Sequence, residues 1–316
     1  MGRILSCPCF IMEILGGLKL ENLTSPTVVV DILKRHGFEF SKSLGQNFLI
    51  DRNILNKIME GANIDSDDYI LEVGPGIGSL TVDLAKRADR VVAVEIDDKL
   101  IPILDETLGD YDNVYVINGD ILEIDLDKLI TDYFSDKPFK IVANLPYYIT
   151  SPIIMSFLES DLPYTDIVVM VQREVAERIV ANPGTKEYGA LTVAVKYYTE
   201  PRIIVNVPAS VFMPPPKVGS AVVKLTRRED TLLEGKEAKL FFQVVRAAFS
   251  KRRKTLLNAL SSYPFEEDIG SKAEIRERLR ECGIEPNRRG ETLSVDEFAY
   301  ITSVIYKHII ENKGRK

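Results

Sequence analysis

The chain has 316 residues, of which 45% are hydrophobic and 28% are charged, and its formal net charge is −7. This composition is typical of a globular protein, and the length suits one large domain followed by a smaller one. The negative charge argues against a protein that coats nucleic acid over its whole surface, although a local basic patch stays compatible with it. After the N-terminus, no apolar run reaches the roughly 18 residues that a membrane span requires, so we expect no membrane partner.

The N-terminus, MGRILSCPCFIMEILGGL, allows three interpretations. It loosely resembles a secretion signal, but Glu13 interrupts the apolar stretch. MGRILS also matches the short myristoylation pattern. We favour the third, in which Met12 is the true start and residues 1–11 are an upstream extension. Residues 1–23 are accordingly expected to form a partly disordered extension.

The chain contains three cysteines and two histidines. Three cysteines are too few for a disulfide framework, which favours a reducing compartment and hence a cytoplasmic location. Cys7-Pro8-Cys9 has no second pair to complete a metal site, and the histidines stand alone. We therefore predict no metal.

From residue 69, short β-branched runs alternate with amphipathic stretches, which is typical of an α/β fold with a Rossmann-like parallel sheet. The expected strands are 69–73, 90–95, 114–117, 139–143 and 166–171. The expected helices are 79–88, 97–108, 126–134 and 151–160. A second set of expected strands, at an antiparallel edge of the sheet, is 190–198, 202–206 and 220–226.

From about Asp230 the pattern becomes helical alone, in amphipathic segments at 236–262, 271–283 and 295–313. We therefore expect a Rossmann-like domain at 24–228 and a small all-helical domain at 229–316.

A glycine loop joins the first strand to a helix that should start near Ser79, in YILEVGPGIGSLTVDLAKR. Glycines there let the backbone approach a ligand closely, but the dinucleotide fingerprint requires a third glycine where this chain has Ser79. Glu72 followed by Gly74, Gly76 and Gly78 looks more like the loop of an S-adenosylmethionine (SAM) methyltransferase.

Two acidic residues end the next strands. Glu95 is placed to accept hydrogen bonds from ribose hydroxyls, although a carboxylate before a turn is the plain alternative. Asp120 beside Ile121 suits an adenine ring, with the exocyclic amine donating to the carboxylate. Because ligands of open α/β sheets bind outside the carboxyl ends of the strands, these residues should line one crevice.

The fourth strand runs into NLPYYITSP, which begins at Asn144. An adenine amine is a poor nucleophile because its lone pair is delocalised, and acceptors that hold both of its hydrogens make it more nucleophilic. The Asn144 side-chain oxygen and the Leu145 carbonyl suit this task, with Pro146 fixing the turn. Tyr147 offers a face on which a flipped base can stack.

At this point the sequence resembles the KsgA/RsmA family of small-subunit rRNA adenine dimethyltransferases. The resemblance rests on NLPYYITSP together with SLGQNFLID, EVGPGIGSLT, QREVAERI and VFMPPPKVGSAVVKL, in the family's order from about Thr24 to the tail. It implies dimethylation of N6 on two adjacent adenosines in a hairpin loop near the 3′ end of 16S rRNA, with SAM as the methyl donor. The implied partner is the small ribosomal subunit or its precursor, and we expect the enzyme to be a monomer.

The resemblance also assigns residues. It implies cofactor contacts at Asn47, Leu49, Gly74, Glu95, Asp120 and Asn144. It implies a target-base clamp of Asn144, Leu145, Pro146 and Tyr147, with Phe212 as the second stacking face. The chain departs from the family at Tyr148, where Asn is frequent, and at Gly219, where Asp or Asn is frequent.

Three other functions are compatible with parts of this pattern. Erm-type methyltransferases, which modify an adenosine of 23S rRNA, share the loop and the clamp. The sequences NLPYYITSP and FMPPPKVGSAVVKL, however, are more similar to those of the small-subunit enzymes. A non-catalytic assembly or transcription factor on this scaffold would be favoured by a broken clamp, and the clamp is intact. An NAD enzyme is disfavoured by Ser79.

Residues 241–260 contain basic residues and no acidic one. A solvated helical face is the ordinary explanation of such a run. Phe241, Val245, Ala248 and Phe249 fall at helical spacing, which places the basic cluster around the next turn. Against an overall charge of −7, we predict an rRNA phosphate contact. Its members are Arg246, Lys251, Arg252, Arg253 and Lys254.

Overall fold

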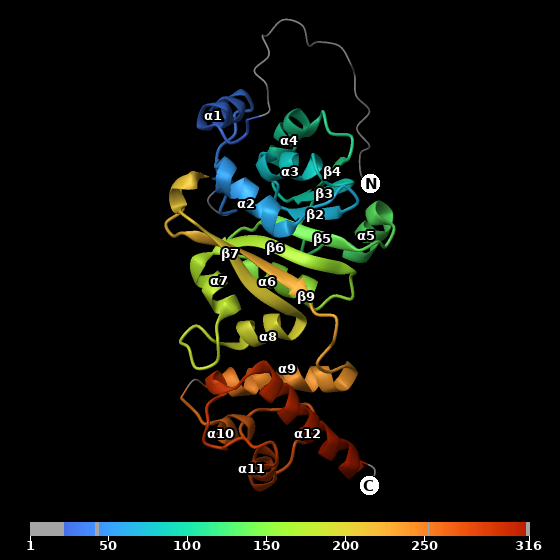
Figure 1. Ribbon diagram of the computed structural model, residues 1–316, viewed down its shortest axis with the longest axis vertical. Coiled ribbons are helices and arrows are strands. Elements are labelled where there is room, and N and C mark those ends of the chain that lie inside the picture. Colours follow the sequence, from blue (N-terminus) through green and yellow to red (C-terminus); the bar gives the residue numbers. More distant parts are fainter. Residues whose placement is uncertain (1–21, 42–43, 252, 314–316) are drawn as a thin grey trace, which may run out of the picture. The chain divides into compact units, whose positions relative to one another are not determined.

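The computed structural model describes residues 22–41, 44–251 and 253–313. The chain divides into two compact units (Figure 1). The first extends to Arg173 and also includes Ile203–Lys224, while the second comprises Glu174–Arg202 and the chain from Leu225 onward. The contacts thus group residues 174–202 with the C-terminal helices, whereas the sequence led us to expect a boundary at 228.

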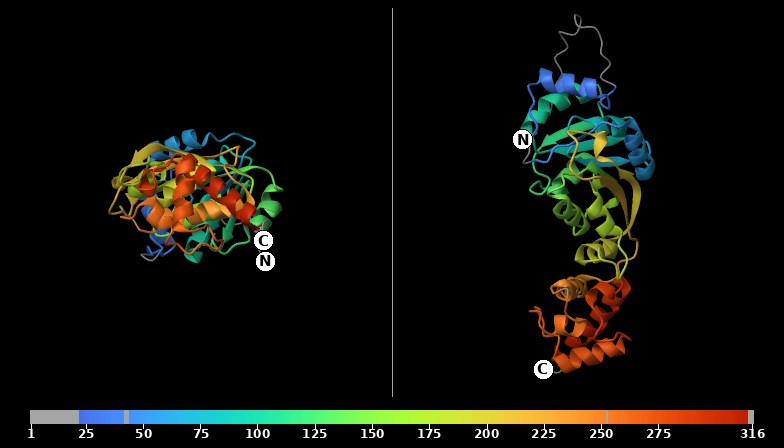
Figure 2. Two further views of the ribbon diagram at one scale, coloured as in Figure 1. Left: turned by 90° about the horizontal axis from the view of Figure 1, so that it is seen from below. Right: turned by 90° about the vertical axis from the view of Figure 1, so that its left-hand side faces the viewer.

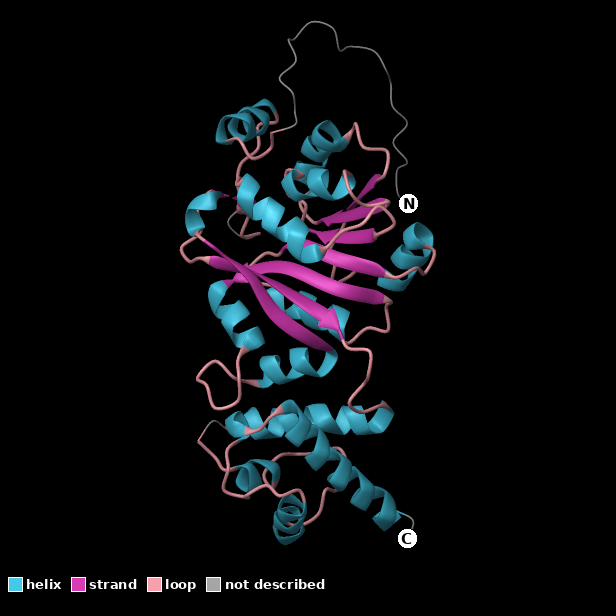
Figure 3. Ribbon diagram, viewed as in Figure 1, coloured by secondary structure: helices cyan, strands magenta, loops and turns pink. Residues whose placement is uncertain are grey.

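A seven-stranded sheet has the order β4-β3-β2-β5-β6-β9-β7 (magenta in Figure 3). Pairing is parallel between β2 and β3, β3 and β4, β2 and β5, and β5 and β6. The strands are β2 (Tyr69–Val73), β3 (Arg90–Glu95), β4 (Val114–Asn118), β5 (Phe139–Asn144), β6 (Tyr164–Gln172), β7 (Thr199–Val207) and β9 (Ser220–Arg227). The α/β class and all five strands expected between residues 69 and 171 are confirmed.

Helices precede the strands of the parallel part or connect them. They are α1 (Pro26–Arg35), α2 (Arg52–Ala62), α3 (Ser79–Ala85), η1 (Asp98–Leu100), α4 (Ile101–Leu108), α5 (Leu126–Phe134) and α6 (Thr150–Leu158). Helices α2 and α3 pack on one face of the sheet through Leu55, Met59 and Leu84, and α6 lies on the opposite face (Figure 2). Because both faces are covered, the strands are near-continuous apolar runs.

The strand order changes direction at β2. Strands β3 and β4 follow it on one side, and β5 and β6 lie on the other. At such a switch point the connections after β2 and β5 leave toward opposite faces, which opens a crevice at the carboxyl ends of the strands.

A two-stranded ribbon lies beside the main sheet. Strand β1 (Phe48–Leu49) pairs antiparallel with β8 (Phe212–Met213), so that Leu49 is opposite Phe212. A short helical turn, η2 (Ala209–Val211), precedes β8. The Phe212 side chain is 2% exposed and belongs to the same apolar core as Leu49.

The prediction of a strand at 190–198 is wrong, because these residues form helix α8 (Ala190–Tyr198). Its β-branched residues were misleading. The Thr192 hydroxyl accepts a hydrogen bond from the N–H of Gly189 at the helix start. Val193 and Tyr197, four residues apart, are both buried in the core of the second unit. The other two members of this set, at 202–206 and 220–226, are confirmed as β7 and β9.

The second unit is helical apart from the ends of β7 and β9. Besides α8 it contains α7 (Arg173–Val180), α9 (Gly235–Phe249), α10 (Leu256–Leu260), α11 (Lys272–Glu281), η3 (Gly290–Thr292) and α12 (Val295–Lys313). Phe241, Leu256 and Phe298 are fully buried in its core. Within the described ranges, no helix has the length and apolar character needed to cross a membrane.

The segment 236–262 is not one helix. Helix α9 ends at Phe249, and α10 begins after Thr255, whose hydroxyl accepts a hydrogen bond from the N–H of Asn258. Side chains of Ser and Thr compete with helix continuation in this way. Three of the basic residues expected on a further helical turn, Lys251, Arg253 and Lys254, therefore lie in the connection between two helices.

Candidate active site

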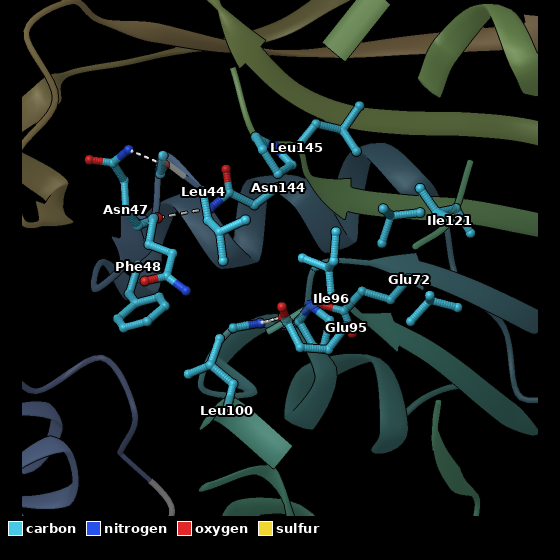
Figure 4. Close-up of a pocket in the computed structure, with 18 of the residues that line it drawn as sticks. Leu44, Asn47, Phe48, Glu72, Glu95, Ile96, Leu100, Ile121, Asn144 and Leu145 are labelled. Carbon is cyan, nitrogen blue, oxygen red and sulfur yellow. Dashed lines mark hydrogen bonds between the residues drawn. The ribbon is translucent and has the colours of Figure 1, made fainter. Parts of the chain in front are cut away.

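A pocket lies at the carboxyl ends of β2, β3 and β5 in the first unit (Figure 4). Nine of the ten residues predicted for the cofactor and the clamp line it. They are Asn47, Leu49, Gly74, Glu95, Asp120, Asn144, Leu145, Pro146 and Tyr147. Residues from five separate stretches of sequence are thus brought to one crevice, as the sheet topology requires.

The glycine loop shapes one wall of the pocket. Gly74 has a φ of +69°, and a Cβ built on it would meet no atom within 4 Å, so a side chain there would occupy open pocket space. At Gly76, with a φ of +62°, a Cβ would lie 3.0 Å from Cδ1 of Phe48. The first glycine therefore leaves room for a ligand, and the second permits close packing of the loop.

Glu95 is 4% exposed, and backbone groups hold both of its oxygens. Oε2 accepts from the N–H of Gly76 at 3.1 Å, and Oε1 accepts from the N–H of Asp97 at 2.9 Å. Burial raises the pKa of the Glu95 carboxyl, and these two hydrogen bonds oppose the shift. Each carboxylate oxygen keeps a lone pair, so the group is oriented in advance to accept two ligand hydroxyls.

Glu72 lies beside Glu95 and is 1% exposed (Figure 4). Its Oε2 has no hydrogen-bond partner among the described residues. Burial raises the pKa of the Glu72 carboxyl to about 8; the nearby Thr81 hydroxyl opposes this shift, and the charge of Glu95 adds to it. A buried polar atom that lines a pocket without a partner leaves a place for a donor on a bound ligand.

Glu72→Gln should alter how stability depends on pH. With a folded-state pKa of about 8 against an ordinary value of 4.5, the folded protein binds more protons than the unfolded chain between these limits. Its stability therefore falls as pH rises through this window, and glutamine removes that loss. In melts without cofactor, the variant's Tm should exceed that of the wild type by more at pH 8 than at pH 5. Exposed Glu123→Gln is the control, and an equal difference at both pH values would contradict the assignment.

Asn144, the last residue of β5, presents its amide to the pocket (Figure 4). Its Nδ2 donates to the Asn47 carbonyl oxygen at 3.2 Å. Asn47 is itself fixed by a 2.7 Å hydrogen bond from its side chain to the Gly45 carbonyl. With Nδ2 engaged, Oδ1 is the part of the amide that remains as an acceptor.

The rest of the clamp follows directly. Leu145 is buried, and its N–H donates to the Met170 carbonyl at 3.2 Å, which extends the pairing of β5 with β6 by one residue. The Tyr147 hydroxyl and the Ser220 hydroxyl are 2.6 Å apart. Burial raises the pKa of Tyr147, so the phenol stays neutral. The turn after β5 is therefore anchored at both ends.

The structure does not bring Phe212 to the pocket. Its pairing with Leu49 turns the ring into the core, where it is 2% exposed, and it is not part of the pocket lining. The family motif implied an exposed stacking face at this residue. The local pattern VFMPPP gives no sign of which face of the short strand is buried, because both Phe212 and Met213 are apolar.

The predicted basic cluster belongs to the second unit. Arg246, Lys251 and Arg253 are exposed, and Lys254 is half-buried. Among the described residues, none of these four forms an ion pair, whereas Arg288 is held by Glu297. Arg252 lies outside the described residues. The charge of the four described side chains is thus available to an anionic partner.

Sequence reasoning missed three residues that line or support the pocket. Gln46 Nε2 donates to Asp97 Oδ2 at 2.6 Å, which ties the loop before β1 to the turn after β3. Tyr148 lines the pocket while 52% exposed. Asp97, two residues after Glu95, caps the helical turn that follows, because its Oδ1 accepts a hydrogen bond from the N–H of Lys99. An aspartate at the start of a helical turn is the sequence signal that could have identified it. Over the ranges with assigned positions, no group of three or more His, Cys, Asp or Glu could hold a metal ion.

A Rossmann-like sheet, an open glycine loop, a buried acidic residue at the end of β3 and an asparagine at the end of β5 together define a SAM-dependent methyltransferase. Residues 37–306 match the family model for ribosomal RNA adenine dimethylase. The chain belongs to this family, and the resemblance inferred from the sequence motifs is confirmed.

Relatives and solved structures agree with this family. The chain is 51% identical over 290 residues to ribosomal RNA small subunit methyltransferase A of Alkaliphilus oremlandii. The matched region covers 92% of this chain and all of the relative. The protein of the same name from Clostridioides difficile is 51% identical, over 90% of this chain and 98% of its own. A dimethyladenosine transferase from Plasmodium falciparum is similar in structure, with a TM-score of 0.71 and 29% identity, over 82% of this chain and 98% of that one. The 23S rRNA methyltransferase ErmE has a TM-score of 0.66 at 29% identity, over 82% and 100% of the two chains.

Proposed function

We propose that this chain transfers methyl groups from SAM to N6 of two adjacent adenosines in the 3′-terminal hairpin loop of 16S rRNA. The product is a pair of N6,N6-dimethyladenosines, which requires four methyl groups in all. The enzyme acts in the cytoplasm, as a monomer, on the small ribosomal subunit or its precursor. The observation that carries the proposal is the Asn144 amide, oriented by Asn47 in the same pocket as Glu95.

SAM, when bound, supplies an electrophilic methyl group on a sulfonium centre. Glu95 holds the ribose hydroxyls, Asp120 accepts from the adenine amine, and Ile121 packs against the adenine face. Asp120 has an oxygen available for this, because among the residues with assigned positions only its Oδ1 is engaged, by the N–H of Leu122 at 2.9 Å. The open space at Gly74 and the unpartnered Glu72 oxygen fit a ligand of this kind.

The target base is held on the other side of the pocket. Asn144 Oδ1 and the Leu145 carbonyl accept the two hydrogens of the adenine amine, which draws the nitrogen lone pair out of the ring and toward the methyl group. Tyr147 stacks on the flipped base, and its bond to Ser220 fixes the ring in place. The proton leaves only after the nitrogen has been alkylated, so no residue with a strongly shifted pKa is needed.

The basic cluster of the second unit would contact rRNA phosphates without reading bases. Lys251→Ala combined with Arg253→Ala should weaken subunit binding and flatten the plot of log K against log salt by roughly 0.7–0.9 per lost contact. Equally exposed cations at the start of α9, Lys236 and Lys239, give the matched control pair. A slope identical to that of the wild type would mean that the cluster is only a solvated face.

Nucleoside analysis tests the reaction itself. Purified protein, SAM and unmethylated small subunits should yield N6,N6-dimethyladenosine on digestion of the RNA, approaching two per subunit. Only monomethyladenosine, or a methyl group on another nucleoside, would contradict the proposal. The Erm-type alternative predicts the same chemistry on 23S rRNA, and the relatives at 51% identity are named for the small subunit.

A further inference from the structure

Two consecutive tyrosines follow β5, and their side chains go in different directions. The Tyr147 hydroxyl is 2.6 Å from Ser220, the first residue of β9. The Tyr148 ring lies instead against Gly45, where a Cβ would be 3.6 Å from its Cδ1. Gly45 lies in the loop in which Gln46 donates to Asp97, two residues after Glu95. Burial raises the pKa of the Tyr148 phenol, and the charges of Asp120 and Glu95 raise it further.

The strand order shows toward which side of β5 each tyrosine side chain is held. Strand β5 has β2, β3 and β4 on one side, and β6, β9 and β7 on the other. Ser220 begins β9, so Tyr147 is held toward that side. Gly45, against which the Tyr148 ring lies, belongs to the loop that Gln46 ties to Asp97 after β3, so Tyr148 is held toward the opposite side. One turn thus supplies an aromatic ring to each half of the pocket.

We infer that Tyr148 is the aromatic wall of the cofactor half, where its ring packs on the adenosyl part of SAM or of the demethylated product. The inference rests on the proposed function, since it takes Glu95 and Asp120 as the residues that hold this adenosyl group. It assigns to the two tyrosines separate tasks: Tyr147 serves the target base, and Tyr148 serves the cofactor.

The exposure and the missing hydrogen-bond partner of the Tyr148 side chain, among the described residues, support this assignment. It lines the pocket and yet is 52% exposed, so much of its ring surface has no protein contact. Its hydroxyl forms no hydrogen bond with any described residue. Gly45, with a φ of +59°, lies against one edge of the ring, near Cδ1 and Cε1. A large aromatic surface that faces a pocket gains free energy when a flat ligand covers it.

The test is a calorimetric titration of SAM into Tyr148→Ala, Tyr148→Phe and Tyr147→Ala. We expect Tyr148→Ala to weaken SAM binding roughly five- to tenfold, while Tyr148→Phe, which keeps the ring, binds nearly as the wild type. Tyr147→Ala should keep its SAM affinity and lose methyl transfer. Tyr300→Ala, which removes a 55% exposed tyrosine from α12, is the control for an exposed ring elsewhere.

Binding of small subunits by the same variants, with the cofactor product saturating, separates the two halves of the pocket. Tyr148→Ala should bind subunits as the wild type does. SAM affinity unchanged in Tyr148→Ala, or a loss confined to subunit binding, would overturn the inference and assign the ring to RNA. Failure of the wild type to bind SAM at all would instead remove the proposed function.

Discussion

Asn144→Ala is expected to lower the rate of methyl transfer by on the order of 10²–10³-fold, the range found when one positioned hydrogen-bonding group is removed from a reacting centre. The physical reason is the loss of an acceptor for one hydrogen of the adenine amine, which returns the nitrogen lone pair to the ring. The measurement is kcat with SAM and unmethylated small subunits both saturating, so that weaker binding cannot account for the change.

Asn144→Asp distinguishes the role of the side-chain acceptor from that of the hydrogen bond that orients it. A carboxylate keeps oxygens that accept from the amine, but it cannot donate to the Asn47 carbonyl, which lies 3.2 Å from Nδ2 in the wild type. We therefore expect a rate between those of the wild type and the alanine variant. Asn56→Ala, an exposed asparagine on α2, is the control. Wild-type kcat in Asn144→Ala would mean that the clamp does not activate the amine.

Glu95→Ala should abolish most SAM binding. The side chain accepts from two ribose hydroxyls in the proposed complex, and a hydrogen bond to a charged group contributes about 1.5–3 kcal/mol. Loss of both corresponds to a decrease in affinity of at least a hundredfold. Calorimetric titration of SAM measures this directly, and a thermal melt of each variant shows whether the fold survives.

Glu95→Gln tests whether the loss of SAM binding comes from a disturbed loop. Alanine also leaves the N–H groups of Gly76 and Asp97 without their buried acceptor. Glutamine keeps the shape and one acceptor oxygen, so we expect a smaller loss, on the order of tenfold. Asp98→Asn removes an exposed charge from the same turn and should bind SAM as the wild type does. Unchanged affinity in a folded Glu95→Gln and Glu95→Ala would exclude this carboxylate from the cofactor site.

The parallel part of the fold was predictable because its signals are local and repeated. Each strand from β2 to β6 is a β-branched run, and each connection carries an amphipathic stretch of helical period. Strand ends in a parallel sheet meet at one edge, so the positions of Gly74, Glu95 and Asn144 along the chain were enough to predict a shared crevice. The pocket lining agrees with that reasoning.

The remaining features depend on contacts that are distant in sequence. Helix α8 was misread because burial of Val193 in a helical core overrides its strand preference. Phe212 is buried because β8 pairs with β1, more than 160 residues earlier in the chain. The break between α9 and α10 coincides with the helix cap at Thr255. This cap was not recognised in the sequence because it directly follows a run of basic residues. The Tyr148 ring lies against Gly45, another contact between residues that are distant in sequence.

The most direct test of the account supplies purified protein and labelled SAM to unmethylated small subunits and, in parallel, to large subunits, and then maps the label on the RNA. We predict label on small subunits, at two adjacent adenosines in the 3′-terminal hairpin loop of 16S rRNA, and none on large subunits. Label on 23S rRNA, or at any other position of the small subunit, would contradict the central claim.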